Sequence, residues 1–142
     1  MDALTTQEVL NEIYLGARAG TYGIDNIKND VKPDLKELIL KQNKLYEEIT
    51  KDCQKFADTN GFELKDLNMF MKAGSFMQSK METMFDSSNS NISELMFNGT
   101  NMGILNITRI INSGIDNEEL LAIAKKFLGH MEDFINSIKD FL

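Results

Sequence analysis

The side chains best suited to nucleophilic catalysis are scarce in this chain. Its 142 residues include one histidine, His130, and one cysteine, Cys53. A cysteine–histidine site would need these two side chains next to each other. Cys53 falls within an apolar pattern of helical spacing, so we expect a small buried side chain. His130 lies beside another such pattern, where we expect it to pack by its edge. The sequence therefore predicts no catalytic centre and no enzyme.

Carboxylates could instead hold a metal. Di-iron sites in helical bundles combine a glutamate from each of two helices with a Glu-x-x-His unit from each of the other two. This chain has no Glu-x-x-His unit, and inward positions carry glycine, glutamine and cysteine. We therefore expect no cofactor and no stoichiometric iron, manganese or zinc. The alternative is a carboxylate site, with these candidate ligands: Glu12, Glu48, Glu94, His130 and Glu132.

Glycines spaced four residues apart mark two of the predicted helices. Inside a helix each glycine costs about 1 kcal/mol relative to alanine, so we expect it to allow a close helix contact, the geometry known from Gly-xxx-Gly pairs. Two such strips suggest that the two helices face each other. A kink at residues 20–23 is the alternative. Polar residues on core lines should fix register or line a small pocket. The candidates for helix contacts or a pocket are Gly16, Gly20, Gln42, Gly99, Gly103 and Asn106.

The elements that must position these residues are helices. Apolar residues at helical spacing predict helices over residues 5–27, 33–60, 65–85, 92–112 and 116–142. Thr5, Asp34 and Asp116 each precede a glutamate by three residues, which is the spacing of a capping box. Gly61 and Gly114 follow predicted helix ends. Residues 86–91 either form a loop in which Asn91 caps the next helix, or lie within one long helix; we favour the break.

Composition excludes several classes of protein. Acidic residues outnumber basic ones by 22 to 15, for a net charge of −7, which argues against nucleic acid or an anionic membrane surface as a partner. No apolar run is long enough to span a bilayer, and the first ten residues lack the features of a secretory signal. A single cysteine excludes an internal disulfide and fits a reducing compartment. We expect one cytoplasmic domain spanning residues 1–142.

The run ELMFNGTNMGILNITRIINSG, followed by a capped helix ending in IKDFL, resembles small ferritin-like-fold bundle proteins of low-GC Gram-positive bacteria. The resemblance covers chiefly residues 75–142 and, more faintly, the first helix. It implies a four-helix, ferritin-like arrangement and supplies no established activity. Short connections between long helices independently predict antiparallel neighbours. The expected fold is thus an all-α, up-and-down bundle of four, or possibly five, helices.

Three functions are compatible with such a bundle. We favour a non-catalytic protein that acts by binding another protein or by self-assembly, because the last helix is apolar on more than one line and such a surface would favour a dimer. A five-helix packing would instead bury this surface within one chain. The alternatives are a carboxylate metalloprotein that handles iron or oxygen, and a carrier of apolar ligands. The carrier would use the methionine-rich segment 65–85, which we otherwise interpret as core. The residues that widen the stripe of the last helix are Ile123, Phe127, Phe134 and Phe141.

Overall fold

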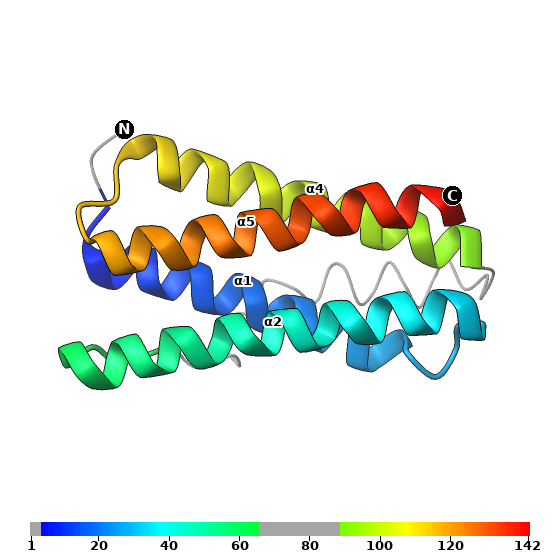
Figure 1. The fold of residues 1–142 in the computed structure, drawn as a ribbon, viewed down its shortest axis with the longest axis horizontal. Coiled ribbons are helices and arrows are strands. Elements are labelled where there is room, and N and C mark those ends of the chain that lie inside the picture. The colour runs from blue at the N-terminus through cyan, green and yellow to red at the C-terminus, as the bar shows by residue number, and fades with distance from the viewer. Residues whose placement is uncertain (1–3, 66–88) are drawn as a thin grey trace.

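The computed structural model describes residues 4–65 and 89–142, and every regular element in them is helical (Figure 1). These residues form four α-helices and no strand, which confirms the all-α prediction. Residues 66–85 of the helix predicted over residues 65–85 and residues 86–88 of the predicted break lie outside the described residues. Ser88, a further polar residue that the helical spacing places on a core line, lies outside them too. The elements are α1 (Thr6–Ile27), α2 (Pro33–Asn60), α4 (Asn89–Ser113), α5 (Glu118–Ile138) and the 3-10 helix η1 (Lys139–Phe141).

Several helix ends are where the local sequence predicts them. Thr5 caps α1: its hydroxyl accepts a hydrogen bond from the backbone N–H of Glu8 at 3.1 Å. Gly61 ends α2 with a φ of 74°, and Gly114 follows α4 with a φ of 98°. Both glycines adopt the left-handed conformation, which a Cβ would disfavour. The α1 helix also runs without interruption through residues 20–23.

Three predicted caps are wrong by a short distance along the chain. Asn91, the expected cap of the helix predicted from residue 92, lies inside α4, which already includes Asn89, so the predicted break does not extend over residues 89–91. The N-cap of α2 is Lys32, because Pro33 already occupies the first helical turn, where its missing N–H needs no partner. Asp34 therefore lies inside α2. The N-cap of α5 is Asn117, whose side chain accepts from the N–H of Leu120 at 2.9 Å. Asparagine caps a helix as well as aspartate does, so composition alone does not choose between Asn117 and Asp116.

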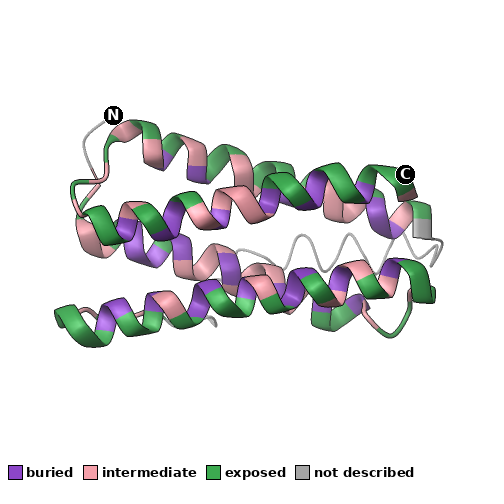
Figure 2. Ribbon diagram, viewed as in Figure 1, coloured by how far each residue is buried: buried purple, intermediate pink, exposed green. Residues whose placement is uncertain are grey.

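The described helices pack lengthwise against one another (Figure 1). Residues 28–32 join α1 to α2, and residues 114–117 join α4 to α5, so the two helices of each pair run in opposite directions. The α2 helix packs against α5, and α1 also contacts α4 and α5. Buried positions line the facing sides of these helices (Figure 2). None of the described helices combines the length and apolarity needed to cross a membrane.

The side chain of Tyr46 on α2 contacts all four described α-helices. A methyl group at Gly20 of α1 would lie 2.5 Å from the tyrosine ring, so the ring packs directly on that backbone. The ring meets Phe127 of α5 edge to face, with centroids 5.8 Å apart. Its hydroxyl is hydrogen-bonded to Gln42 of α2 and to Thr100 of α4. Burial raises the pKa of Tyr46 and these hydrogen bonds act in the opposite direction, so the phenol stays neutral at pH 7.

The other glycines with close neighbours also lie against large side chains. A methyl group would lie 3.1 Å from the Phe127 ring at Gly16 and 2.9 Å from Sδ of Met131 at Gly103. Both of these neighbours belong to α5. The suggestion that the glycine strips of α1 and α4 face each other is therefore wrong. Gly16, Gly20 and Gly103 each make room for a bulky side chain of another helix. Such a side chain fills the space beside the glycine, whereas a facing glycine would leave it empty.

The wide apolar stripe of α5 is covered within the chain. Ile123, Phe127 and Phe134 are buried, and Phe141 in η1 packs partly buried against the core. They are covered because α5 packs on α1, α2 and α4, whereas the dimer argument assumed a single contact seam. The α5 stripe therefore gives no support for a dimer. Any self-association must use another surface.

One ion-pair cluster joins the exposed edges of α2 and α5. Lys126 forms an ion pair with Glu48 and a second with Asp52 at 2.9 Å. The hydrogen bond and charge of Lys126 lower the pKa of Glu48, and the hydrogen bond to Glu48 is the main cause that raises the pKa of Lys126. The side chains of Lys126 and Glu48 are 37% and 50% exposed, so solvent screens the pair and its contribution to stability is small.

The Gly20 contact predicts opposite effects for two alanine substitutions in α1. Gly20→Ala should destabilise the fold by about 1–3 kcal/mol, because the new methyl group overlaps the Tyr46 ring. Gly23→Ala is the matched control: no atom lies within 4 Å of the added methyl group, so better helix propensity should stabilise by about 0.5–1 kcal/mol. Urea denaturation of both variants measures the difference. Equal effects of the same sign would contradict the close contact.

The ion-pair cluster predicts a pH window for the effect of Lys126→Met. Glu48 has a lowered pKa, so its contribution is present above the pKa of the unfolded chain and is lost as pH falls through the folded value. Lys126 has a raised pKa, so its contribution is lost as pH rises through the folded value. The variant should therefore be less stable than the wild type near neutral pH and should match it at both extremes. The urea midpoint across pH measures this, with Lys125→Met as the control; a pH-independent difference would contradict it.

Candidate functional site

The candidate metal ligands are spread over the bundle. Glu12, Glu94 and Glu132 are exposed on three different helices. Glu48 forms an ion pair with Lys126 of α5. His130 is half-buried, and its Nε2 atom is buried without a hydrogen-bond partner among the described residues. The pKa of Glu48 is lowered mainly by its hydrogen bond to Lys126, and the charge of His130 makes a smaller contribution in the same direction. Within residues 4–65 and 89–142, no three side chains of the His, Cys, Asp or Glu type are grouped so that they could hold a metal ion.

The polar helix-contact candidates have different environments. Gln42 is buried, and its amide donates to the backbone carbonyl of His130 at 3.2 Å, which links α2 to α5. Asn106 is exposed, so its predicted place on a core line is wrong: it precedes the buried Ile107 and points about 100° away from it around the helix. It still joins two helices, because its amide donates to the carboxylate of Glu12 at 3.1 Å. Gly99 is half-buried in α4.

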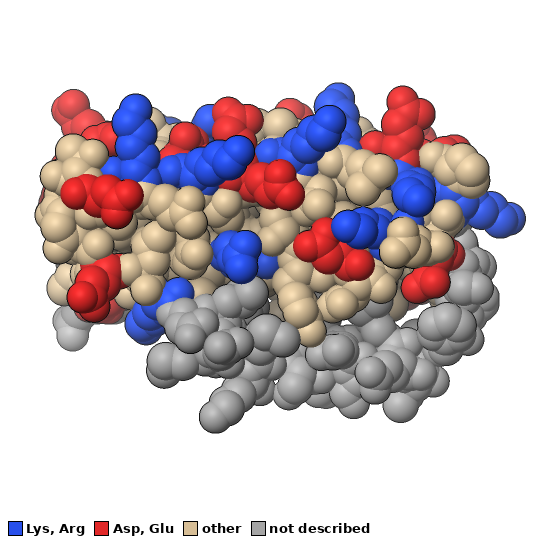
Figure 3. Space-filling view, turned by 90° about the horizontal axis from the view of Figure 1, so that it is seen from below, with Lys and Arg blue, Asp and Glu red and all other residues tan. Residues whose placement is uncertain are grey.

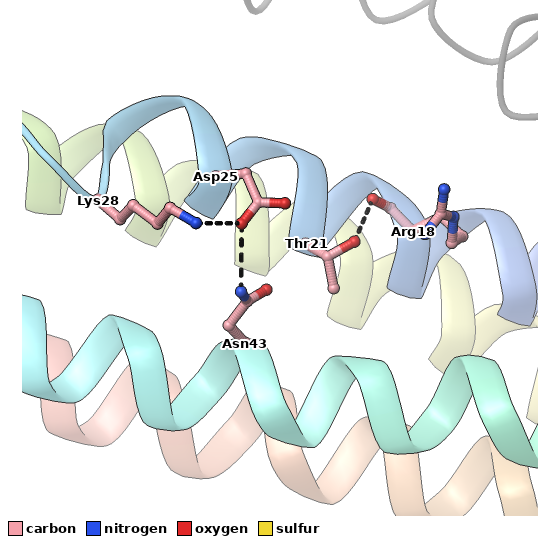
Figure 4. Close-up of polar contacts among 5 residues, drawn as sticks. All are labelled: Arg18, Thr21, Asp25, Lys28 and Asn43. Carbon is pink, nitrogen blue, oxygen red and sulfur yellow. Dashed lines mark hydrogen bonds and ion pairs between the residues drawn. The ribbon is translucent and has the colours of Figure 1, made fainter.

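Sequence reasoning missed several buried polar residues between α1 and α2. Figure 4 shows the Asp25 carboxylate accepting from Lys28 at 3.2 Å and from the amide of Asn43 at 3.3 Å. The Thr21 hydroxyl donates to the carbonyl of Arg18 within α1. A polar contact of this kind between helices favours one register, because a shift would leave its groups unpaired. The signal available in the sequence was polar residues seven apart on α2, Asn43 and Thr50, which are both buried.

Cys53 is fully buried and carries no disulfide. Burial is the main cause that raises the pKa of its thiol to about 12, and the charge of Asp52 adds to the effect. Because the thiolate is the nucleophilic form, the folded protein keeps this cysteine unreactive. Its interpretation as a small apolar core residue agrees with this environment.

The outward side of α4 differs from the rest of the described surface. Met102 and Leu105 are 68% and 50% exposed, and the only other exposed large apolar side chain in the described residues is Leu142 at 54%. Met102 and Leu105 are three residues apart, so they lie on one side of the helix. By contrast, Figure 3 shows the side of the molecule along α2, where lysine and arginine alternate with aspartate and glutamate.

Few charges flank these two apolar side chains. The α4 helix contains two charged residues in 25, Glu94 and Arg109. At about 100° per residue, seven exposed residues fall within an arc of about 100°. This arc lies opposite the core side of α4, where Thr100 and Ile107 are buried. We call these seven residues the α4 outer face: Glu94, Asn98, Asn101, Met102, Leu105, Arg109 and Asn112.

The environment of Cys53 predicts its reactivity. A maleimide or iodoacetamide reagent should modify it far more slowly in the native protein than in urea, because burial blocks access and the raised pKa leaves almost no thiolate at pH 8. Mass spectrometry over time measures the rate, and a peptide containing Cys53 is the control. Native labelling as fast as that of the peptide would contradict the buried environment.

In comparisons with known proteins, no family model, no curated protein and no solved structure matches this chain. The resemblance to ferritin-like bundle proteins therefore stays a prediction.

Proposed function

We propose that this protein is a non-catalytic helical bundle that acts by protein contact at the α4 outer face, by binding a second copy of itself or another protein. The exposure of Met102 and Leu105 carries this proposal. Removal of apolar surface from water is worth about 25 cal/mol per Å². A surface with an apolar centre and few charges gains from being covered, because few charged groups lose their hydration.

The environments of the two potential nucleophilic residues support a non-catalytic function. Cys53 is buried, with a pKa raised to about 12. His130 lies on α5, where its backbone carbonyl accepts from Gln42 and its Nε2 atom is buried. A cysteine–histidine pair would need an accessible thiol of lowered pKa, which is the opposite of the environment of Cys53.

We further propose a ferritin-like, up-and-down bundle located in the bacterial cytoplasm. Support for the topology comes from the opposite directions of α1 and α2, and of α4 and α5. Support for the location comes from the unpaired Cys53, since thiols stay reduced in the cytoplasm. An experimental structure of the whole chain tests the topology, and cell fractionation tests the location.

Sedimentation of the purified protein tests the proposed function. We expect the average mass of the wild type to rise with concentration, and we expect Met102→Lys with Leu105→Lys to abolish this rise. The matched control adds the same two charges on exposed positions of α5, as Ala122→Lys with Asn136→Lys. Because the wild type has a net charge of −7, both variants reduce the overall repulsion between copies. If only the Met102→Lys and Leu105→Lys variant loses association, the contact involves the α4 outer face.

A photo-crosslinking residue at position 105 covers the case of a different partner. We expect covalent adducts from position 105 and none from position 125 on the exposed side of α5. A wild type that is monomeric at every concentration and gives no adduct from position 105, either pure or in lysate of the source cells, would overturn the proposed function.

A further inference from the structure

We propose that the α4 outer face receives α4 of a second copy of this chain in an antiparallel pair, with Glu94 of each copy facing Arg109 of the other. This inference rests on the proposed function and specifies its partner. The pair would be isologous, since the same surface of both copies would meet across a two-fold axis.

The positions of the residues on the α4 outer face suit a two-fold axis. In an antiparallel pair, the residue numbers of facing positions have a constant sum. With the axis between Asn101 and Met102, Glu94 stands opposite Arg109 and Asn98 stands opposite Leu105. All of these residues are exposed in the single chain. The apolar side chains thus lie near the axis, and the charges lie at the two ends of the contact.

The charges of Glu94 and Arg109 favour the antiparallel pair over a parallel pair. Within the described residues, neither Glu94 nor Arg109 forms an ion pair, so both are available to a partner. In a parallel pair Glu94 would face Glu94 of the other copy, and Arg109 would face Arg109. Like charges would then meet and repel each other. In the antiparallel pair each negative charge faces a positive one, twice per dimer.

The overall charge of the protein also favours this face for self-contact. Two copies, each with a net charge of −7, repel each other at long range. The α4 outer face carries one negative and one positive charge, so its own charge sums to zero. Two copies that meet at α4 bring together a face with few charges and no net charge, whereas the α2 side would bring together many charged groups of both signs (Figure 3).

Charge reversal tests the proposed pairing. Glu94→Lys alone and Arg109→Glu alone each place like charges opposite each other twice per dimer, so each should weaken dimerisation by about tenfold. The double variant, Glu94→Lys with Arg109→Glu, restores opposite charges and should return the dissociation constant to near the wild-type value. Sedimentation equilibrium measures this constant, and circular dichroism checks that each variant is folded.

Single cysteines test the direction of the pair. Asn101→Cys lies near the proposed axis, so a short bismaleimide should join two copies. Asn112→Cys lies on the same face, but in the antiparallel pair its two copies are separated by about 30 Å along the helix, so it should not crosslink. A parallel pair would crosslink at both positions. Native Cys53 stays in place because it is buried.

The outcomes separate this inference from the proposed function. Rescue by the double reversal, together with crosslinking at position 101 alone, supports the antiparallel pair. A wild-type dimer that is indifferent to the reversals, or that crosslinks at both positions, overturns the antiparallel pair and leaves self-association through α4 intact. A monomer that forms an adduct with another protein from position 105 overturns the inference and leaves protein binding as the function.

Discussion

The packing of one tyrosine holds the described helices in their arrangement. The ring of Tyr46 lies on the α1 backbone at Gly20 and against Phe127 of α5, and its hydroxyl reaches Thr100 of α4. These contacts depend on one another. The ring can approach α1 only because Gly20 has no side chain, and the hydroxyl can be buried only because Gln42 and Thr100 satisfy it. Glycines that are unfavourable for an isolated helix thus become favourable in the bundle.

This central packing also decides which side of α4 meets solvent. Thr100 points to the tyrosine, and Gly103 makes room for Met131 of α5. With these residues turned inward, the helical repeat places Met102 and Leu105 outward. Two apolar side chains are therefore exposed as a consequence of how the core is built. Because α4 has few charged residues, few strongly hydrated groups surround these two side chains, and this is why we propose a protein contact there.

The same packing restricts the few reactive side chains that the sequence contains. Cys53 is fully buried, and the side-chain amide of Gln42 donates a hydrogen bond to the backbone carbonyl of His130. Two of the candidate carboxylates connect helices: Glu48 of α2 pairs with Lys126 of α5, and Glu12 of α1 accepts a hydrogen bond from Asn106 of α4. Several polar and ionisable side chains of the described residues thus connect helices, which gives partners to groups at the buried boundary.

The sequence by itself determined the helical class, most helix ends and the burial of Cys53, because apolar spacing, caps and glycine stops act over a few residues. Only the tertiary structure decided which helices meet. It placed Gly20 against an aromatic ring, covered Phe127 and Phe134 within the chain, and left Met102 exposed. The helical period shows which residues share a face, but it does not show what that face meets. That depends on side chains distant in sequence, whose shapes must fit together at once.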